Sequence, residues 1–175
     1  MADEQSTEAK QQRLATVGAI ADYWEARQPP LLIAVPWIDS CECCWRCGDK
    51  GSLQRCHIIP DSRGGSGKPE NLLLLCARCH REAPNVADSR FMLAWLEVTA
   101  DPDYWHEQAV ALFKRIHNRE PFSRLRGDPS PDRQRSAMKQ AASLSSTHYS
   151  DGWWNPATVC AMFELAEELM LADTV

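Results

Sequence analysis

Two pairs of cysteines, each with two residues between its members, lie on either side of a segment that contains histidines. Cys44 and Cys47 form the first pair, and Cys76 and Cys79 form the second. Zinc binds four thiolates at the corners of a tetrahedron, and each Cys-x-x-Cys turn can supply two of them. Reduced cysteines packed in a core are the alternative. Because two such pairs rarely arise by chance, the spacing predicts a structural zinc site.

The register of the first pair needs a choice, because Cys41 and Cys44 are also separated by two residues. Gly48 follows Cys47 directly, and a glycine there permits the tight turn of a zinc knuckle. We therefore expect Cys44 and Cys47 to be the ligands, with Cys41 and Cys43 as spare thiols.

Three further residues could do chemistry next to these thiols. His57 follows Cys56, Asn71 precedes a run of four leucines, and His80 follows Cys79 directly. An imidazole titrates near pH 6.5, so it can accept a proton or bind a metal ion at neutral pH. These residues indicate a small metal-dependent site supported by the zinc cluster.

The elements that must position these residues can be read from the apolar pattern. Segments 53–59 and 72–75 are the strand candidates, and a loop rich in glycine and polar residues, 61–69, joins them. A short helix should follow, to about Glu82. A helix over 7–26 precedes this region and must end at Pro29-Pro30. The segment 31–38 fits either an edge strand or an extended connector.

Helices are also expected after this region. Asp88 or Ser89 can cap one helix, Asp101-Pro102 can start a second, and Asn155-Pro156 can start the last. The last helix has an apolar face for the core or for a partner chain, and we favour the core. Its other side should carry Glu164, Glu167 and Glu168. The chain therefore divides into 1–40 (helix and connector), 41–90 (α+β core), 91–120 (packing helices), 121–150 (linker or surface loop) and 151–175 (C-terminal helix).

The charge distribution bears on the partner. The 175 residues carry a net charge of −5, yet residues 44–90 hold eight basic and five acidic side chains. This basic segment in an acidic chain fits a surface that faces phosphates, although a mixture of solvated charges would look the same. The polar start of the chain lacks the apolar core of a signal peptide, and no apolar run is long enough to span a bilayer. We therefore expect a cytoplasmic protein.

Residues 41–90 resemble the HNH nucleases, whose catalytic unit is the ββα-metal fold. The resemblance rests on Cys-x-x-Cys-Gly (44–48), His-Ile-Ile-Pro (57–60), Gly-Gly (64–65), Asn-Leu-Leu-Leu-Leu-Cys (71–76) and Cys-His (79–80). It implies an α+β fold in which a zinc-stapled ββα core carries additional flanking helices. Arg81-Glu-Ala-Pro-Asn85 also resembles the continuation seen in one bacterial subgroup.

The resemblance also implies roles for individual residues. His57 would be the general base that takes a proton from the attacking water, and His80 would bind a catalytic Mg²⁺ or Mn²⁺ ion. Asn71 would tie down the loop and so orient His57. His80 could instead be an alternative zinc ligand, since it adjoins Cys79.

Cys56 departs from the family pattern. Many members have Asp or His before the base histidine, and that residue helps to bind the metal. Cys56 is a packing residue, a thiolate ligand that would favour softer ions, or a sign of a weakened site. We favour packing. Asp61 is a candidate carboxylate for the ion.

The sequence therefore predicts a metal-dependent DNA endonuclease or nickase, with a possible homodimer and no membrane association. The alternative is a non-catalytic zinc module that binds nucleic acid or protein. Six basic side chains are candidates for phosphate contacts: Arg46, Arg55, Arg63, Lys68, Arg78 and Arg81.

Overall fold

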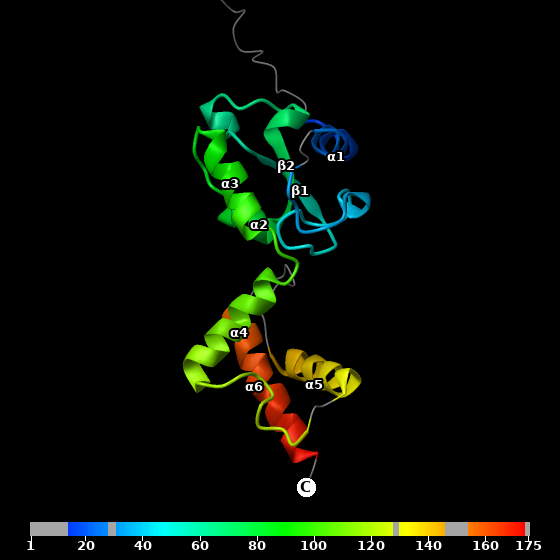
Figure 1. Ribbon diagram of the computed structural model, residues 1–175, viewed down its shortest axis with the longest axis vertical. Helices are drawn as coiled ribbons and strands as arrows, with labels where there is room; N and C mark the ends of the chain where they lie inside the picture. Colours follow the sequence, from blue (N-terminus) through cyan, green and yellow to red (C-terminus); the bar gives the residue numbers. More distant parts are fainter. Residues whose placement is uncertain (1–13, 28–30, 128–129, 146–153, 174–175) are drawn as a thin grey trace, which may run out of the picture. The chain divides into compact units, whose positions relative to one another are not determined.

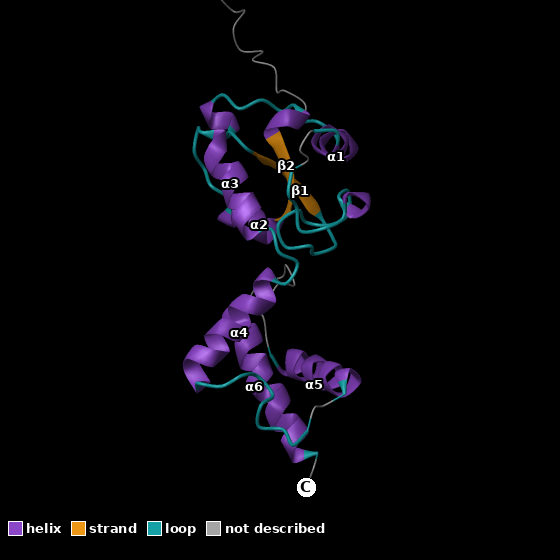
Figure 2. Cartoon of the chain, viewed as in Figure 1, coloured by secondary structure: helices purple, strands orange, loops and turns teal. Residues whose placement is uncertain are grey.

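The computed structural model describes residues 14–27, 31–127, 130–145 and 154–173. The chain forms two compact units, Met1–Pro102 and Asp103–Val175. The first unit holds both strands of the described residues, and the second is built from helices (Figure 2).

A two-stranded antiparallel sheet lies at the centre of the first unit. Strand β1 (Leu53–His57) pairs with β2 (Leu72–Cys76), so that Leu53 lies opposite Cys76 and His57 lies opposite Leu72. All five β2 side chains are buried, which explains their continuous apolar run. The two predicted strands are confirmed, but β1 ends at His57 rather than at residue 59. Beyond His57, the Ile58 amide still donates to the Asn71 carbonyl at 2.8 Å, and Ile59 is hydrogen-bonded to the side chain of Asn71.

Two helices pack directly on this hairpin. Helix α2 (Ala77–Glu82) follows β2 without a loop, and α1 (Val17–Glu25) lies on the other side of the strands (Figure 1). The indole Nε1 of Trp24 in α1 donates to the carbonyl of Leu72 at 2.8 Å. Helix α1 begins at Val17, because the Thr16 hydroxyl caps it. Residues 14–16 are not helical, so the helix predicted for 7–26 does not include them. Residues 7–13 lie outside the described residues.

The remaining elements of the first unit are a helix and three short turns. Helix α3 (Ser89–Thr99) begins after Asp88, whose carboxylate accepts from the Arg90 amide as predicted for a cap. One-turn 3₁₀ helices are η1 (Trp37–Asp39), η2 (Asp61–Arg63) and η3 (Pro69–Asn71). Residues 31–36 are not a strand, so this segment is an extended connector.

The second unit contains α4 (Tyr104–His117), α5 (Pro131–Leu144) and α6 (Pro156–Ala172). Helix α6 packs against both of the others. Its buried residues Cys160 and Phe163 meet Phe113 of α4, so the preference for core packing of the last helix is confirmed. The Asn155 side chain caps α6, as its sequence predicted.

Two predictions for this unit need correction. Residues 131–144 form α5 inside the predicted linker, because Ser130 caps the helix and Ala137 and Ala141 bury a narrow face of small side chains. Glu167 was assigned to the polar side of the last helix, yet it is fully buried. Both of its carboxylate oxygens accept from Arg119, at 2.8 and 2.5 Å, which compensates the buried charge.

Candidate active site and cysteine cluster

Four cysteines of the first unit converge at one end of the hairpin. Their sulfur atoms all lie within 4.8 Å of one another, and all four side chains are buried. The first pair, Cys44 and Cys47, comes from the loop before β1. The second pair, Cys76 and Cys79, comes from the junction of β2 with α2. A zinc ion with bonds of about 2.3 Å requires sulfur separations of roughly 3.8 Å. The Cys47–Cys76 separation of 3.9 Å fits this requirement.

The cluster contains Cys44 and Cys47, the pair that the sequence analysis chose, and a tight turn at Gly48 holds them. The Gly48 amide donates to the Cys44 carbonyl at 2.9 Å, and Gly48 has φ +72°, a conformation that favours glycine. Cys41 is exposed and does not belong to the cluster, and neither does Cys43. His80 is not part of the group either, so the alternative in which it replaces a cysteine ligand is not supported.

The thiols of the cluster influence one another strongly. Hydrogen bonds with Cys44, Cys47 and Cys79 lower the pKa of the Cys76 thiol, whereas Cys44 and its neighbours raise the pKa of Cys47. Such crowding of thiols is typical of a site whose sulfurs bind a metal ion as thiolates.

Arg46 lies between Cys44 and Cys47 in the sequence, but it is not a phosphate contact. The residue is 1% exposed, and its Nη1 donates to Glu82 Oε2 at 2.7 Å. The same nitrogen lies 3.8 Å from Cys79 Sγ. The guanidinium group also covers the ring of Trp95, at 4.7 Å from its centroid. The prediction for Arg46 is thus wrong, because this cation joins the cysteine cluster to α2 and α3.

The loop after β1 is held by the side chain of Asn71. Its Oδ1 accepts from the Ile59 amide at 2.8 Å, and its Nδ2 donates to the carbonyls of Ile59 and Ser66 at 3.0 and 2.8 Å. Asn71 is 8% exposed. The buried amide group therefore closes the loop immediately after His57.

Gly65 allows the loop to close this tightly. A Cβ atom at this position would lie 1.7 Å from the Ile59 carbonyl oxygen and 2.8 Å from Asn71 Nδ2. The preceding Gly64 has φ +83°, and its amide donates to the Asp61 carbonyl at 2.9 Å. The two glycines of the motif thus serve a close backbone approach and a left-handed turn.

A cavity of about 300 Å³ opens where β1, the following loop and α2 meet. Its walls bring together both histidines and the candidate carboxylate from the sequence analysis, His57, His80 and Asp61. The other lining residues are Cys56, Pro60, Arg81, Ala83, Pro84 and Asn85. Asn71 does not line this cavity, in agreement with an indirect role.

His80 lies at the wall contributed by α2. Burial and the nearby His57 both lower the pKa of its imidazole, so the neutral form is favoured. A neutral imidazole can bind a metal ion. Its Nδ1 lies 2.7 Å from the Oε1 of Gln54 on β1. The His80 imidazole and the Asp61 carboxylate together give this cavity ligand atoms that suit a divalent cation.

Cys56 is 2% exposed, and burial raises the pKa of its thiol to about 12. A thiol with this pKa stays protonated at neutral pH. Both observations support the preferred interpretation of Cys56 as a packing residue at the edge of the cavity.

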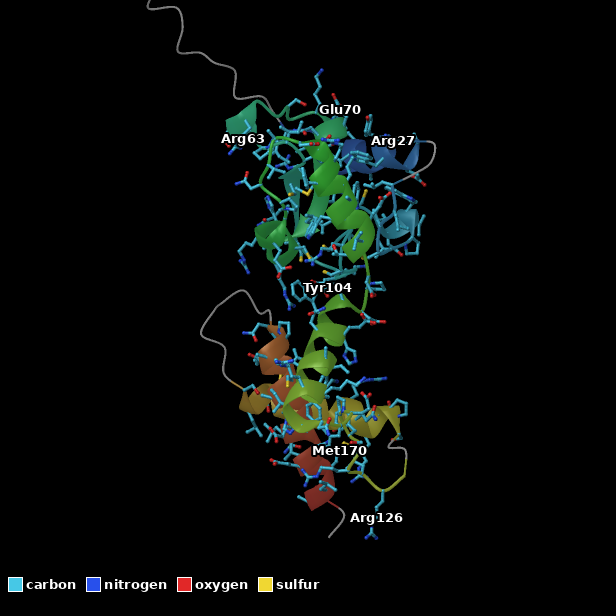
Figure 3. The ribbon with its side chains drawn as sticks, turned by 60° about the vertical axis from the view of Figure 1, so that its left-hand side comes forward. Arg27, Arg63, Glu70, Tyr104, Arg126 and Met170 are labelled. Carbon is cyan, nitrogen blue, oxygen red and sulfur yellow. The ribbon has the colours of Figure 1, made fainter. Side chains whose placement is uncertain are left out.

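The other candidate phosphate contacts are spread over the first unit. Arg63 lies on η2, in the loop between the strands (Figure 3), and Lys68 is exposed on the same loop. Arg55 is exposed on β1 and donates to the Ala15 carbonyl at 3.4 Å, while Arg81 lines the cavity. Arg78 is half-buried, and burial lowers the pKa of its guanidinium group.

The comparisons with known proteins agree with this arrangement. Residues 41–85 match the HNH endonuclease family model. The matched segment contains the cysteine cluster, both strands, α2 and every residue that lines the cavity. No curated protein and no solved structure matches the chain. No helix among the described residues has the length and apolar character needed to cross a membrane.

Sequence reasoning missed two features of the HNH segment. Gln54 was assigned no role, because a polar residue at an exposed strand position does not by itself indicate a function. Pro84 and Asn85 line the cavity, and the resemblance of residues 81–85 to a bacterial subgroup was the only indication of their importance.

Proposed function

We propose that this chain is a metal-dependent HNH endonuclease or nickase that hydrolyses DNA phosphodiester bonds. The observation that carries the proposal is the shared cavity of His57 and His80 within the segment that matches the HNH family model. HNH nucleases act on DNA, so the match of residues 41–85 supports DNA as the substrate.

In this proposal His57 is the general base. It accepts a proton from the water that attacks the phosphorus atom, and the closed loop behind it fixes the position of its backbone. The Asn71 amide keeps that loop closed from outside the cavity.

His80 is the proposed ligand of the catalytic ion, with Asp61 as a further oxygen donor in the same cavity. When bound, Mg²⁺ or Mn²⁺ would stabilise the negative charge that develops on the phosphate and on the leaving oxygen. Arg81 lines the same cavity, so its guanidinium group is the proposed phosphate contact at the site itself.

The four-cysteine cluster is proposed to bind a structural Zn²⁺ ion. It would fix the junction of β2 and α2, and so the position from which His80 projects. Arg55, Arg63, Lys68, Arg78 and Arg81 are proposed to contact DNA phosphates, which would position DNA without selecting a sequence. A homodimer would allow cleavage of both strands.

The decisive experiment incubates the purified protein with supercoiled plasmid, in Mg²⁺ or Mn²⁺ and in chelator. Relaxed or linear plasmid that forms only with the divalent ion supports the proposal. If no condition produces metal-dependent nicking, the chain is instead a non-catalytic zinc module, a function that the absence of Asp or His at position 56 would favour. A DNA-binding assay on the same sample then measures that second function.

A further inference from the structure

We propose that Gln54 is a positioning residue that selects the tautomer of His80. This inference rests on the proposed function, in which His80 binds the catalytic ion. The observation that carries it is the 2.7 Å contact between Gln54 Oε1 and His80 Nδ1, which joins β1 to α2 at a histidine that lines the cavity.

The contact determines which ring nitrogen carries the proton. An amide oxygen can only accept a hydrogen bond, and two acceptors facing each other at 2.7 Å would repel. The hydrogen must therefore lie on Nδ1 of His80. In a neutral imidazole the lone pair is then on Nε2, the atom left for a metal ion.

The backbone keeps Gln54 in place for this contact. Gln54 lies opposite Leu75 in the β ladder, and it shares a face of β1 with Cys56, since side chains alternate along a strand. Helix α2 starts directly after β2, so the same hairpin fixes both partners of the hydrogen bond. Mutation of a residue that orients a metal-binding histidine typically lowers metal affinity by roughly 10- to 100-fold.

Three variants separate orientation from general stability. Gln54→Met keeps the length of the side chain but removes the acceptor, and Gln54→Glu keeps an acceptor. Gln108→Met changes an exposed glutamine of α4 and serves as the matched control. ¹⁵N NMR of the zinc-loaded protein without added Mg²⁺ or Mn²⁺, with His80 assigned by comparison with His80→Ala, reads the tautomer directly. Titration with Mn²⁺ gives the affinity.

We expect wild type, Gln54→Glu and Gln108→Met to show His80 protonated on Nδ1. In Gln54→Met the two tautomers should mix, and Mn²⁺ should bind roughly 10- to 100-fold more weakly. Zinc content and melting temperature should not change. Protonation of wild-type His80 on Nε2, unchanged Mn²⁺ affinity in Gln54→Met, or no Mn²⁺ binding that depends on His80 would each overturn the proposal. If the tautomer and affinity behave as expected but plasmid is not nicked, the proposed function fails while the role of Gln54 stands.

Discussion

Asn71 binds the backbone of Ile59 through both ends of its amide group, with Oδ1 accepting from the Ile59 amide at 2.8 Å and Nδ2 donating to its carbonyl at 3.0 Å. The pairing imitates one rung of a β ladder beyond the end of β1. It thereby continues the hairpin through a side chain at the point where the backbone turns into the loop.

Asn71→Asp should therefore disturb the loop more than its small change in shape suggests. The new carboxylate can still accept from the Ile59 amide, but it faces two carbonyl oxygens that it cannot donate to. We expect a loss of roughly 2–4 kcal/mol in the free energy of unfolding. Denaturant titration measures it, and a variant as stable as wild type would contradict the described hydrogen bonds.

Gly65→Ala should be severely destabilising, because its Cβ would meet the Ile59 carbonyl oxygen at 1.7 Å. The expected loss is on the order of 3 kcal/mol or more. Gly18→Ala is the matched control, since a Cβ in α1 meets nothing within 4 Å. It should be neutral or up to about 1 kcal/mol stabilising. Equal melting temperatures for the two variants would show that the loop is not closed as described.

His57→Ala should lower the rate of plasmid nicking by roughly 10²- to 10⁴-fold, because it removes the proposed general base. Zinc content and melting temperature should remain near those of wild type, since His57 lies outside the cysteine cluster. Elemental analysis and calorimetry on the same sample provide the control. Loss of zinc in this variant would make the role of His57 structural.

Cys79→Ser should lose the bound zinc, whereas Cys41→Ser should retain one ion per chain. The two substitutions are chemically identical, but only Cys79 belongs to the cluster. Elemental analysis distinguishes them, and chelation of wild-type protein should lower its melting temperature in the same way as Cys79→Ser. Zinc loss in Cys41→Ser would reverse the choice of register made on Gly48.

Arg46→Lys should weaken the cysteine cluster although it preserves the charge. A lysine cannot reach Glu82, Thr99 and the Cys79 sulfur with one planar group, as the guanidinium does. Because Glu82 is 44% exposed, we expect a loss of only about 2 kcal/mol. Zinc transfer to a chromogenic chelator should be faster than in wild type. Arg90→Lys, an exposed substitution on α3, should leave this rate unchanged.

The local patterns of the sequence predicted the parts of the fold that depend on nearby residues. The leucine run of β2, the cap at Asp88 and the Asn155-Pro156 start each act within a few residues, and the structure confirms all three. Helix α5 was missed because its buried face consists of alanines, whose burial produces little periodic signal. The cap residue Ser130 next to Pro131 was the available indication.

The burial of charged side chains could not be predicted, because their partners are distant in the sequence. Arg46 meets Glu82, 36 residues later, and Arg119 meets Glu167, 48 residues later. An isolated arginine or glutamate resembles a solvated residue until its partner is known. The two histidines could be predicted as site residues, because their spacing resembles that of the HNH family. Both of them line the same cavity.

Strand β2 also sets a limit on how the chain can vary in length. It is buried on both faces, and only its five residues separate the loop anchor Asn71 from the first residue of α2. One inserted residue in this strand would turn the following side chains to the opposite face. It would displace Cys76 and His80 together relative to Ile59. We therefore expect the ten residues from Asn71 to His80 to tolerate changes of apolar side chain far better than any insertion or deletion.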